Sequence, residues 1–210
     1  PGGREIDFVP CQDSLVVHGP AGSGKAALCA RLLDQLLTLS YQCCIIGAEV
    51  NGLQTPAEVE TFGDVHEAPR LTDILSALEQ PTASVAINLA ALSVETRPVF
   101  TDALFLQLQA LHDRVGRPHA IFMREAHRFL TGVSAASSAR LSEVSMIYSS
   151  SERERLPTQL TSGVTFVVDS ATHAIAAGGV AGRISALPAV DCVDGKDSVS
   201  EPDAATASGY

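Results

Sequence analysis

The chain of 210 residues has the length of one large domain and can bury a full hydrophobic core without disulfides or metals. Hydrophobic residues make up 46% of it and charged residues 18%, which excludes general disorder. The longest apolar runs are too short for a transmembrane helix. The formal net charge of -10 makes DNA an unfavourable partner, because binding to a phosphate backbone depends on Lys and Arg.

The five cysteines are odd in number and show no CxxC spacing, which favours free thiols in a reducing compartment. Three of them, Cys29, Cys43 and Cys44, lie inside apolar runs, where small buried thiols are common. The beginning of the chain has no basic region followed by an apolar stretch, as a secretory signal would have. We therefore expect a cytoplasmic protein.

Apolar runs alternate with stretches of helical apolar spacing, which is the pattern of a parallel sheet covered by helices. The sequence predicts strands over residues 14–18, 43–47, 84–89, 119–123 and 164–168, and helices over residues 25–39 and 96–115. Residues 134–155 are rich in Ser and Ala and end in a charge cluster, so we predict one or two surface helices there. We expect one domain over residues 1–193 and a disordered acidic tail over residues 194–210.

A glycine-rich loop, Gly19-Pro20-Ala21-Gly22-Ser23-Gly24-Lys25, follows the first predicted strand and opens the first helix. This is the G-x-x-x-x-G-K core of a phosphate-binding loop (Walker A motif) in the context that the motif requires. Its glycines let successive backbone N–H groups point at an anion, and the helix N-terminus adds partial positive charge. Lys25 adds a point charge for the β- and γ-phosphates. The alternative is a glycine-rich turn leading into an ordinary helix. The predicted nucleotide site consists of Gly19, Pro20, Ala21, Gly22, Ser23, Gly24, Lys25, Ala26 and Ala27.

A second signal lies about a hundred residues further on, where an apolar strand ends in Arg124-Glu125-Ala126-His127. A P-loop ATPase places its second acidic motif at the end of such a strand, with an Asp that orders Mg²⁺ and a Glu that polarises the attacking water. Glu125 stands at the Glu position, which makes it the candidate catalytic residue beside Lys25. Arg124 stands at the Asp position and has the wrong charge for a metal ligand.

The order strand, GPAGSGK, helix and then GRPHAIFMREAHRFL resembles the HerA/FtsK-type branch of P-loop ATPases, which includes conjugation and DNA-pumping motors. The resemblance spans residues 15–168, and the segment 47–51 is similar to an Asp-Pro-Glu-Gly-Asp segment of that branch. It implies a three-layer α/β P-loop NTPase fold with a mainly parallel central sheet flanked by helices. It also implies ATP as the nucleotide and either a homo-oligomer or a fused partner domain, since related modules occur joined to phosphatase domains.

Three departures from this family pattern concern the metal. The family's loop continues with Ser or Thr, whose hydroxyl binds Mg²⁺, whereas this chain has Ala26. Arg124 replaces the Asp before Glu125, and Gly47 replaces an Asp at the end of the second strand. We therefore expect ATP binding with weak or absent Mg²⁺-dependent hydrolysis and make Mg²⁺ a doubtful cofactor. The alternative is an active ATPase in which other carboxylates take over the metal, the candidates being Asp169, Asp64 and Glu49.

Other polar residues leave their roles open. Asp169-Ser170 follows an apolar strand, where it serves either as a γ-phosphate sensor or as a helix cap. Four arginines are candidates either for an arginine finger toward a neighbouring subunit or for solvated surface charge: Arg128, Arg140, Arg153 and Arg155. The six histidines show no zinc spacing, and the segment 64–67 is predicted to be a loop.

Overall fold

The structure is a computed structural model. It describes the backbone of residues 4–8, 14–49, 55–131, 144–156, 164–168, 175–177 and 180–186. The surroundings of side chains are described within residues 14–49, 55–131 and 144–156, apart from Arg153. The predicted domain boundary at residue 193 and the predicted acidic tail lie outside the described residues.

Most of the predicted elements are present. The strands are β1 (Arg4–Phe8), β2 (Leu15–His18), β3 (Cys43–Gly47), β4 (Val59–Phe62), β5 (Ser84–Asn88), β6 (Ala120–Met123), β7 (Ser145–Ser150), β8 (Val164–Val168), β9 (Ile175–Ala177) and β10 (Val180–Ala186). The helices are α1 (Lys25–Thr38), α2 (Leu71–Leu78) and α3 (Thr96–Val115), with the 3₁₀ turns η1 (Ala126–Arg128) and η2 (Arg153–Arg155). The sequence did not predict β1, β4, α2, β7, β9 or β10.

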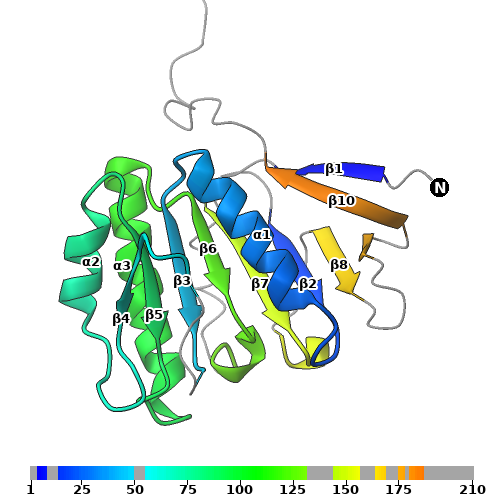
Figure 1. Cartoon of the computed structure of the whole chain (residues 1–210). Coiled ribbons are helices and arrows are strands. Elements are labelled where there is room, and N and C mark those ends of the chain that lie inside the picture. Colours follow the sequence, from blue (N-terminus) through cyan, green and yellow to red (C-terminus); the bar gives the residue numbers. More distant parts are fainter. Residues whose placement is uncertain are drawn as a thin grey trace, which may run out of the picture.

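The strands form one sheet in the order β1-β10-β9-β8-β2-β7-β6-β3-β5-β4. Every neighbouring pair from β8 to β4 is parallel, and β9 is antiparallel to both β8 and β10. The sheet is therefore mainly parallel, as predicted. Since parallel strands end at the same edge, the loops after β2, β7, β6 and β3 gather along one edge of the sheet, as Figure 1 shows.

Alternating residues of each strand divide the core into two layers, one on each face of the sheet. On one face, Leu15 and Val17 of β2 pack in a cluster with Leu32 and Leu36 of α1. On the other face, Val16 joins a cluster that contains the buried side chains of α2 and α3. Helix α1 thus covers one face and α2 with α3 the other (Figure 1), which gives the three-layer α/β arrangement.

The prediction of surface helices over residues 134–155 is wrong where the structure describes that segment. Ser145–Ser150 is the strand β7, and all six of its residues are buried. It pairs with β2 on one side and with β6 on the other. The buried run Val144 to Tyr148 explains this outcome, because apolar residues that are covered on both faces favour an interior parallel strand over a surface helix. Residues 132–143 lie outside the described residues.

The prediction of buried, free thiols is confirmed for the described cysteines. Cys29, Cys43 and Cys44 are free and buried. Burial raises the pKa of the Cys29 thiol to about 12, although Arg124 and Lys25 act in the opposite direction. Cys29 packs in the core cluster shared by α1 and β2 and is therefore an inert packing residue rather than a nucleophile.

Candidate nucleotide site

The glycine-rich loop connects β2 to α1 at the carboxyl edge of the sheet. Gly22 and Gly24 have positive φ angles of 77° and 100°, which a side chain would strain. Gly24 is the N-cap of α1 and makes no side-chain hydrogen bond, so the first N–H groups of a 14-residue helix have no side-chain cap at this end. Such a helix start after a strand is a favourable place for a phosphate group.

Lys25 is the first residue of α1 and is only 6% exposed. Its ammonium donates a hydrogen bond to the carbonyl oxygen of Pro20, at 3.2 Å, across the loop itself. Its Nζ also lies 3.1 Å from Oε1 of Glu125. The structure therefore brings the two candidate catalytic residues, Lys25 and Glu125, together at one edge of the sheet, although they are a hundred residues apart in the sequence.

Glu125 follows β6 in a left-handed backbone conformation, with φ 49° and ψ 53°. Such a conformation costs roughly 1–3 kcal/mol for a residue other than Gly, so surrounding contacts must hold it. Its backbone N–H donates to Ser149 Oγ at 3.2 Å. Its Oε2 accepts hydrogen bonds from the Ser151 N–H and hydroxyl, at 3.0 and 2.9 Å. Backbone and carboxylate are thus both fixed by the end of β7.

The carboxylate of Glu125 is charged at neutral pH. Burial by itself would raise its pKa, but the hydrogen bonds from Ser151 and the Lys25 ammonium outweigh burial and hold the pKa below its ordinary value. His127 lies behind it, with Nδ1 3.5 Å from Glu125 Oε2 and 3.0 Å from Ser150 Oγ. Burial lowers the pKa of His127, against the effect of Glu125 and Glu152, so the imidazole is neutral near pH 7.

Arg124 is ion-paired with a carboxylate from the neighbouring strand end. Its Nη2 lies 3.2 Å from Oε2 of Glu49, and the two side chains are 22% and 20% exposed. The backbone carbonyl of Glu49 accepts a hydrogen bond from Asn88 Nδ2 at 3.2 Å, which ties this position to the end of β5. Burial raises the pKa of Glu49, with Arg124 acting against it. The guanidinium is therefore held by Glu49, just after the end of β3.

The residues present do not fit a Mg²⁺ ion of the kind that the resemblance implies. The side chain of Ala26 has no oxygen, and Glu49 is paired with Arg124. The second substitute, Asp64, accepts hydrogen bonds from the N–H groups of His66 and Glu67 in its own turn. The third, Asp169, lies outside the described residues. Within the ranges that the structure describes, no three His, Cys, Asp or Glu side chains are grouped so as to hold a metal ion.

The serines at the end of β7 are not among the predicted site residues, because the sequence predicts a helix where the structure has this strand. Ser149, Ser150 and Ser151 lie between the loop and β6: the Gly19 N–H donates to the Ser150 carbonyl at 3.3 Å, and Ser151 holds Glu125. The apolar run before these serines, followed by polar residues, is the signal that could have found them. Asp169-Ser170, the sensor candidate, lies outside the described residues.

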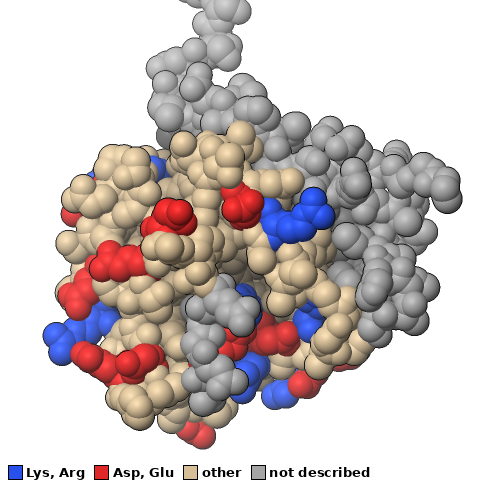
Figure 2. All heavy atoms as spheres, viewed as in Figure 1, with Lys and Arg blue, Asp and Glu red and all other residues tan. Residues whose placement is uncertain are grey.

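The structure describes the side chains of two of the four candidates for an arginine finger. Arg128 is exposed, and Arg155 forms an exposed pair with Glu152 at 3.1 Å. The side chain of Arg153 and the whole of Arg140 lie outside the described part. Figure 2 shows Asp and Glu interspersed with Lys and Arg over the described part of one face rather than a broad basic surface. An unfavourable interaction with DNA stays a prediction.

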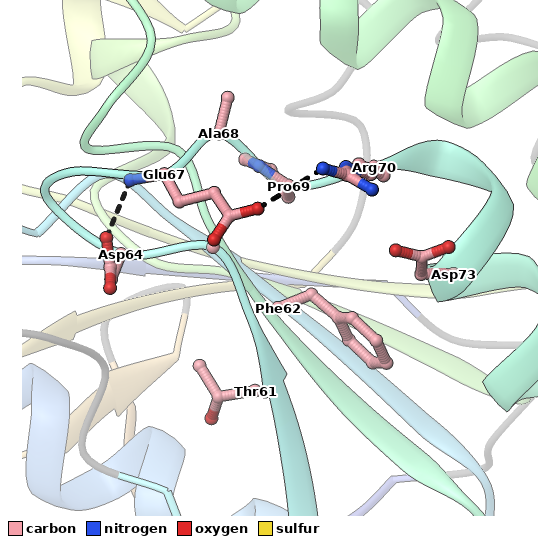
Figure 3. Close-up of a pocket in the computed structure, with 9 residues that line it drawn as sticks. Thr61, Phe62, Asp64, Glu67, Ala68, Pro69, Arg70 and Asp73 are labelled. Atoms are coloured by element: carbon pink, nitrogen blue, oxygen red, sulfur yellow. Dashed lines mark hydrogen bonds and ion pairs between the residues drawn. The ribbon is translucent and has the colours of Figure 1, made fainter.

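A pocket of about 300 Å³ lies away from the loop, at the end of β4 and the start of α2 (Figure 3). Its rim carries Asp64 and Asp73, together with an ion pair of Glu67 and Arg70 at 3.6 Å. Both members of that pair are more than 70% exposed. In the order of the sheet, β4 is separated from β2 by β7, β6, β3 and β5, so this pocket is distinct from the loop.

Together these features define an α/β protein with a fold like that of P-loop NTPases. The genome packaging NTPase B204 from Sulfolobus turreted icosahedral virus 2 has a similar structure. Its complex with ATP-gammaS matches with a TM-score of 0.53 and 14% sequence identity, over 75% of this chain and 74% of that chain. Its complex with AMPPCP matches with a TM-score of 0.52 and 15% identity, over 75% of both chains. This likeness establishes the fold.

No family model matches the chain, and no curated protein matches it. Among the described residues, no helix combines the length and the apolar character needed to cross a membrane.

Proposed function

We propose that this chain binds ATP at the loop of residues 19–27 and hydrolyses it slowly or not at all with Mg²⁺. The observation that carries the proposal is the meeting of Lys25, Glu125 and the uncapped start of α1 at the carboxyl edge of a parallel sheet. The complexes of the similar packaging NTPase with ATP-gammaS and AMPPCP support a nucleoside triphosphate as the ligand. They also support a place near the HerA/FtsK-type branch.

Each group has a defined task in this proposal. The backbone N–H groups of the loop and the start of α1 bind the phosphate oxygens, and Lys25 adds the positive charge. Arg124 supplies a second, permanent charge close to the phosphates, where Mg²⁺ would otherwise neutralise them. Glu125 is the only carboxylate we assign to water activation. The groups that bind phosphate are thus present, whereas oxygens that would organise Mg²⁺ are replaced at Ala26 and Arg124.

A titration tests this proposal. The chain is titrated with ATP by calorimetry, with Mg²⁺ and with EDTA, and released phosphate is measured in the same samples. We expect binding under both conditions and turnover far below the roughly 1–10³ s⁻¹ of ordinary enzymes. Lys25→Ala should weaken binding by about tenfold or more, because a charge-assisted hydrogen bond to phosphate is lost.

Arg70→Ala is the matched control for this loss, since Arg70 is an exposed cation at the separate pocket. Equal affinities of Lys25→Ala and the parent would refute the assignment of the loop. Brisk Mg²⁺-dependent phosphate release by the parent would instead favour the active ATPase. That alternative includes a motor or regulatory module of a larger protein, and phosphate release that increases in an oligomer or a larger protein containing this chain would support it.

A further inference from the structure

The positive charges of the proposed site are already used by the protein. Lys25 is bonded to Glu125 and to the loop carbonyl of Pro20, and Arg124 is paired with Glu49. These two cations and two carboxylates sum to zero charge. An ammonium has three donors, and two of those of Lys25 are directed at oxygens of the protein.

The carboxylate of Glu125 is held more firmly than the ammonium it binds. Its Oε2 accepts two hydrogen bonds from Ser151, and its backbone N–H donates to Ser149. Lys25, by contrast, has a flexible stem of four carbons and only its head group is bonded. When the pair separates, the group that moves is therefore Lys25.

A phosphate bonded to Lys25 in its present position would lie beside the carboxylate of Glu125. Two anions a few ångströms apart repel each other strongly where burial reduces solvent screening. The Lys25–Glu125 pair has side chains that are 7% and 26% exposed, so screening by water is limited there. The phosphate and the carboxylate therefore compete for the same ammonium.

We propose that nucleotide binds by an exchange of ion-pair partners. The phosphates replace Glu125 as the partner of Lys25, and they compete with Glu49 for Arg124. Without nucleotide, these carboxylates act as internal substitutes for phosphate and keep weak anions out. This inference rests on the proposed function and adds a regulatory step to it. It implies that the carboxylates lower the affinity of the parent chain for polyphosphate. Loss of the carboxylate charge at Glu125 should therefore increase that affinity.

The test is the affinity of Glu125→Gln for AMPPNP and for inorganic tripolyphosphate, measured by calorimetry in EDTA. Neither probe needs Glu125 for chemistry, so slower hydrolysis cannot mimic tighter binding. We expect affinity to increase by about tenfold, since one competing charge-assisted hydrogen bond is removed. Glu49→Gln should give a smaller increase, because Arg124 is the more exposed cation. Unchanged melting temperatures identify variants that keep their fold, and Glu125→Asn offers a second variant suited to a positive φ.

Two control variants remove one negative charge, as Glu125→Gln does. Glu152→Gln removes a carboxylate that contacts His127 in the same region, and Glu79→Gln removes one that pairs with Arg114 on the surface. Equal increases for Glu125→Gln and Glu152→Gln would overturn the exchange, because general repulsion would explain both. Unchanged or weaker binding by Glu125→Gln would also overturn it, provided that the parent binds. Failure of the parent and of every variant to bind either probe would refute the proposed function itself.

The chain has only two lysines, Lys25 and Lys196, which permits a direct observation of the exchange. In a sample with ¹³C-labelled lysine, the Lys25 signal is assigned by its loss in Lys25→Ala. It should shift when AMPPNP is added to the parent and should shift in free Glu125→Gln. If the chemical shift of Lys25 were the same in Glu125→Gln as in the parent, the result would contradict the ion pair on which the inference depends.

Discussion

Two regions at the carboxyl edge of the sheet carry charged side chains, and they differ in burial. At the loop, the Lys25–Glu125 pair is largely buried, and Glu125 has an unfavourable backbone conformation held by serines. At the pocket of β4 and α2, the Glu67–Arg70 pair is exposed to solvent. Exposed pairs contribute about 0–1 kcal/mol and need no function to explain them. The described pocket is therefore a poorer guide to function here than the buried charges.

The largest effect on folding stability is expected at Gly63, a residue that lines the pocket. Its φ angle is +78°, and an added Cβ would lie 2.6 Å from the carbonyl oxygen of Asn88. Gly63→Ala should lower the free energy of unfolding by about 2–4 kcal/mol, through backbone strain and a clash with backbone. Chemical denaturation measures this loss.

Gly22→Ala is the matched change in the loop, where φ is +77° but no atom beyond the two adjacent residues lies within 4 Å of the added Cβ. It should cost only about 1 kcal/mol of stability. If both variants lost the same stability, the crowding at Gly63 would not be the cause. The contrast would show that the pocket's glycine is required by packing, whereas the loop's glycine is required by backbone conformation alone.

The next largest effect, on Mg²⁺-dependent phosphate release, is expected at the two positions that would organise the metal. The double change Ala26→Ser with Arg124→Asp restores a hydroxyl and a carboxylate, and it should increase Mg²⁺-dependent phosphate release by about tenfold. Arg124→Asp also leaves Glu49 without its cation, so the melting temperature should fall. Arg124→Asp alone is the control for the hydroxyl. A double variant with the same phosphate release as the parent would contradict our account of the impaired metal site.

The smallest expected effect concerns pH. The pKa of Glu125 is lowered in the folded chain, so its stabilising contribution is full above its unfolded pKa near 4.5 and is lost as pH falls through the folded pKa. Glu125→Gln should therefore flatten the dependence of stability on pH below about 5. Denaturation curves at several acidic pH values measure this. Asp64→Asn should flatten it as well, because backbone hydrogen bonds lower the pKa of Asp64. An unchanged slope for Glu125→Gln would mean that its carboxylate is not held as the structure indicates.

Much of this architecture follows from local sequence. The apolar runs of the strands and the helical apolar spacing of α1 predict a parallel sheet covered by helices, because strands that are buried on both faces need apolar residues at successive positions. The loop was predictable because its chemistry lies within seven consecutive residues. The strand β7 was not predicted, because its serines and the neighbouring Ser-rich segment resemble a polar helix or loop when burial is unknown.

The sequence by itself therefore specified the glycine-rich loop between a strand and a helix, made Lys25 and Glu125 the candidate site residues, and placed side chains without carboxylate or hydroxyl oxygens at Ala26 and Arg124. Only the tertiary structure decided the partners of these charges. Glu49, Glu125 and Ser151 come from the ends of three different strands, and the order of β3, β6 and β7 in the sheet brings them together. A local pattern specifies where a strand ends, but strand order depends on long-range packing, which no short stretch of sequence contains.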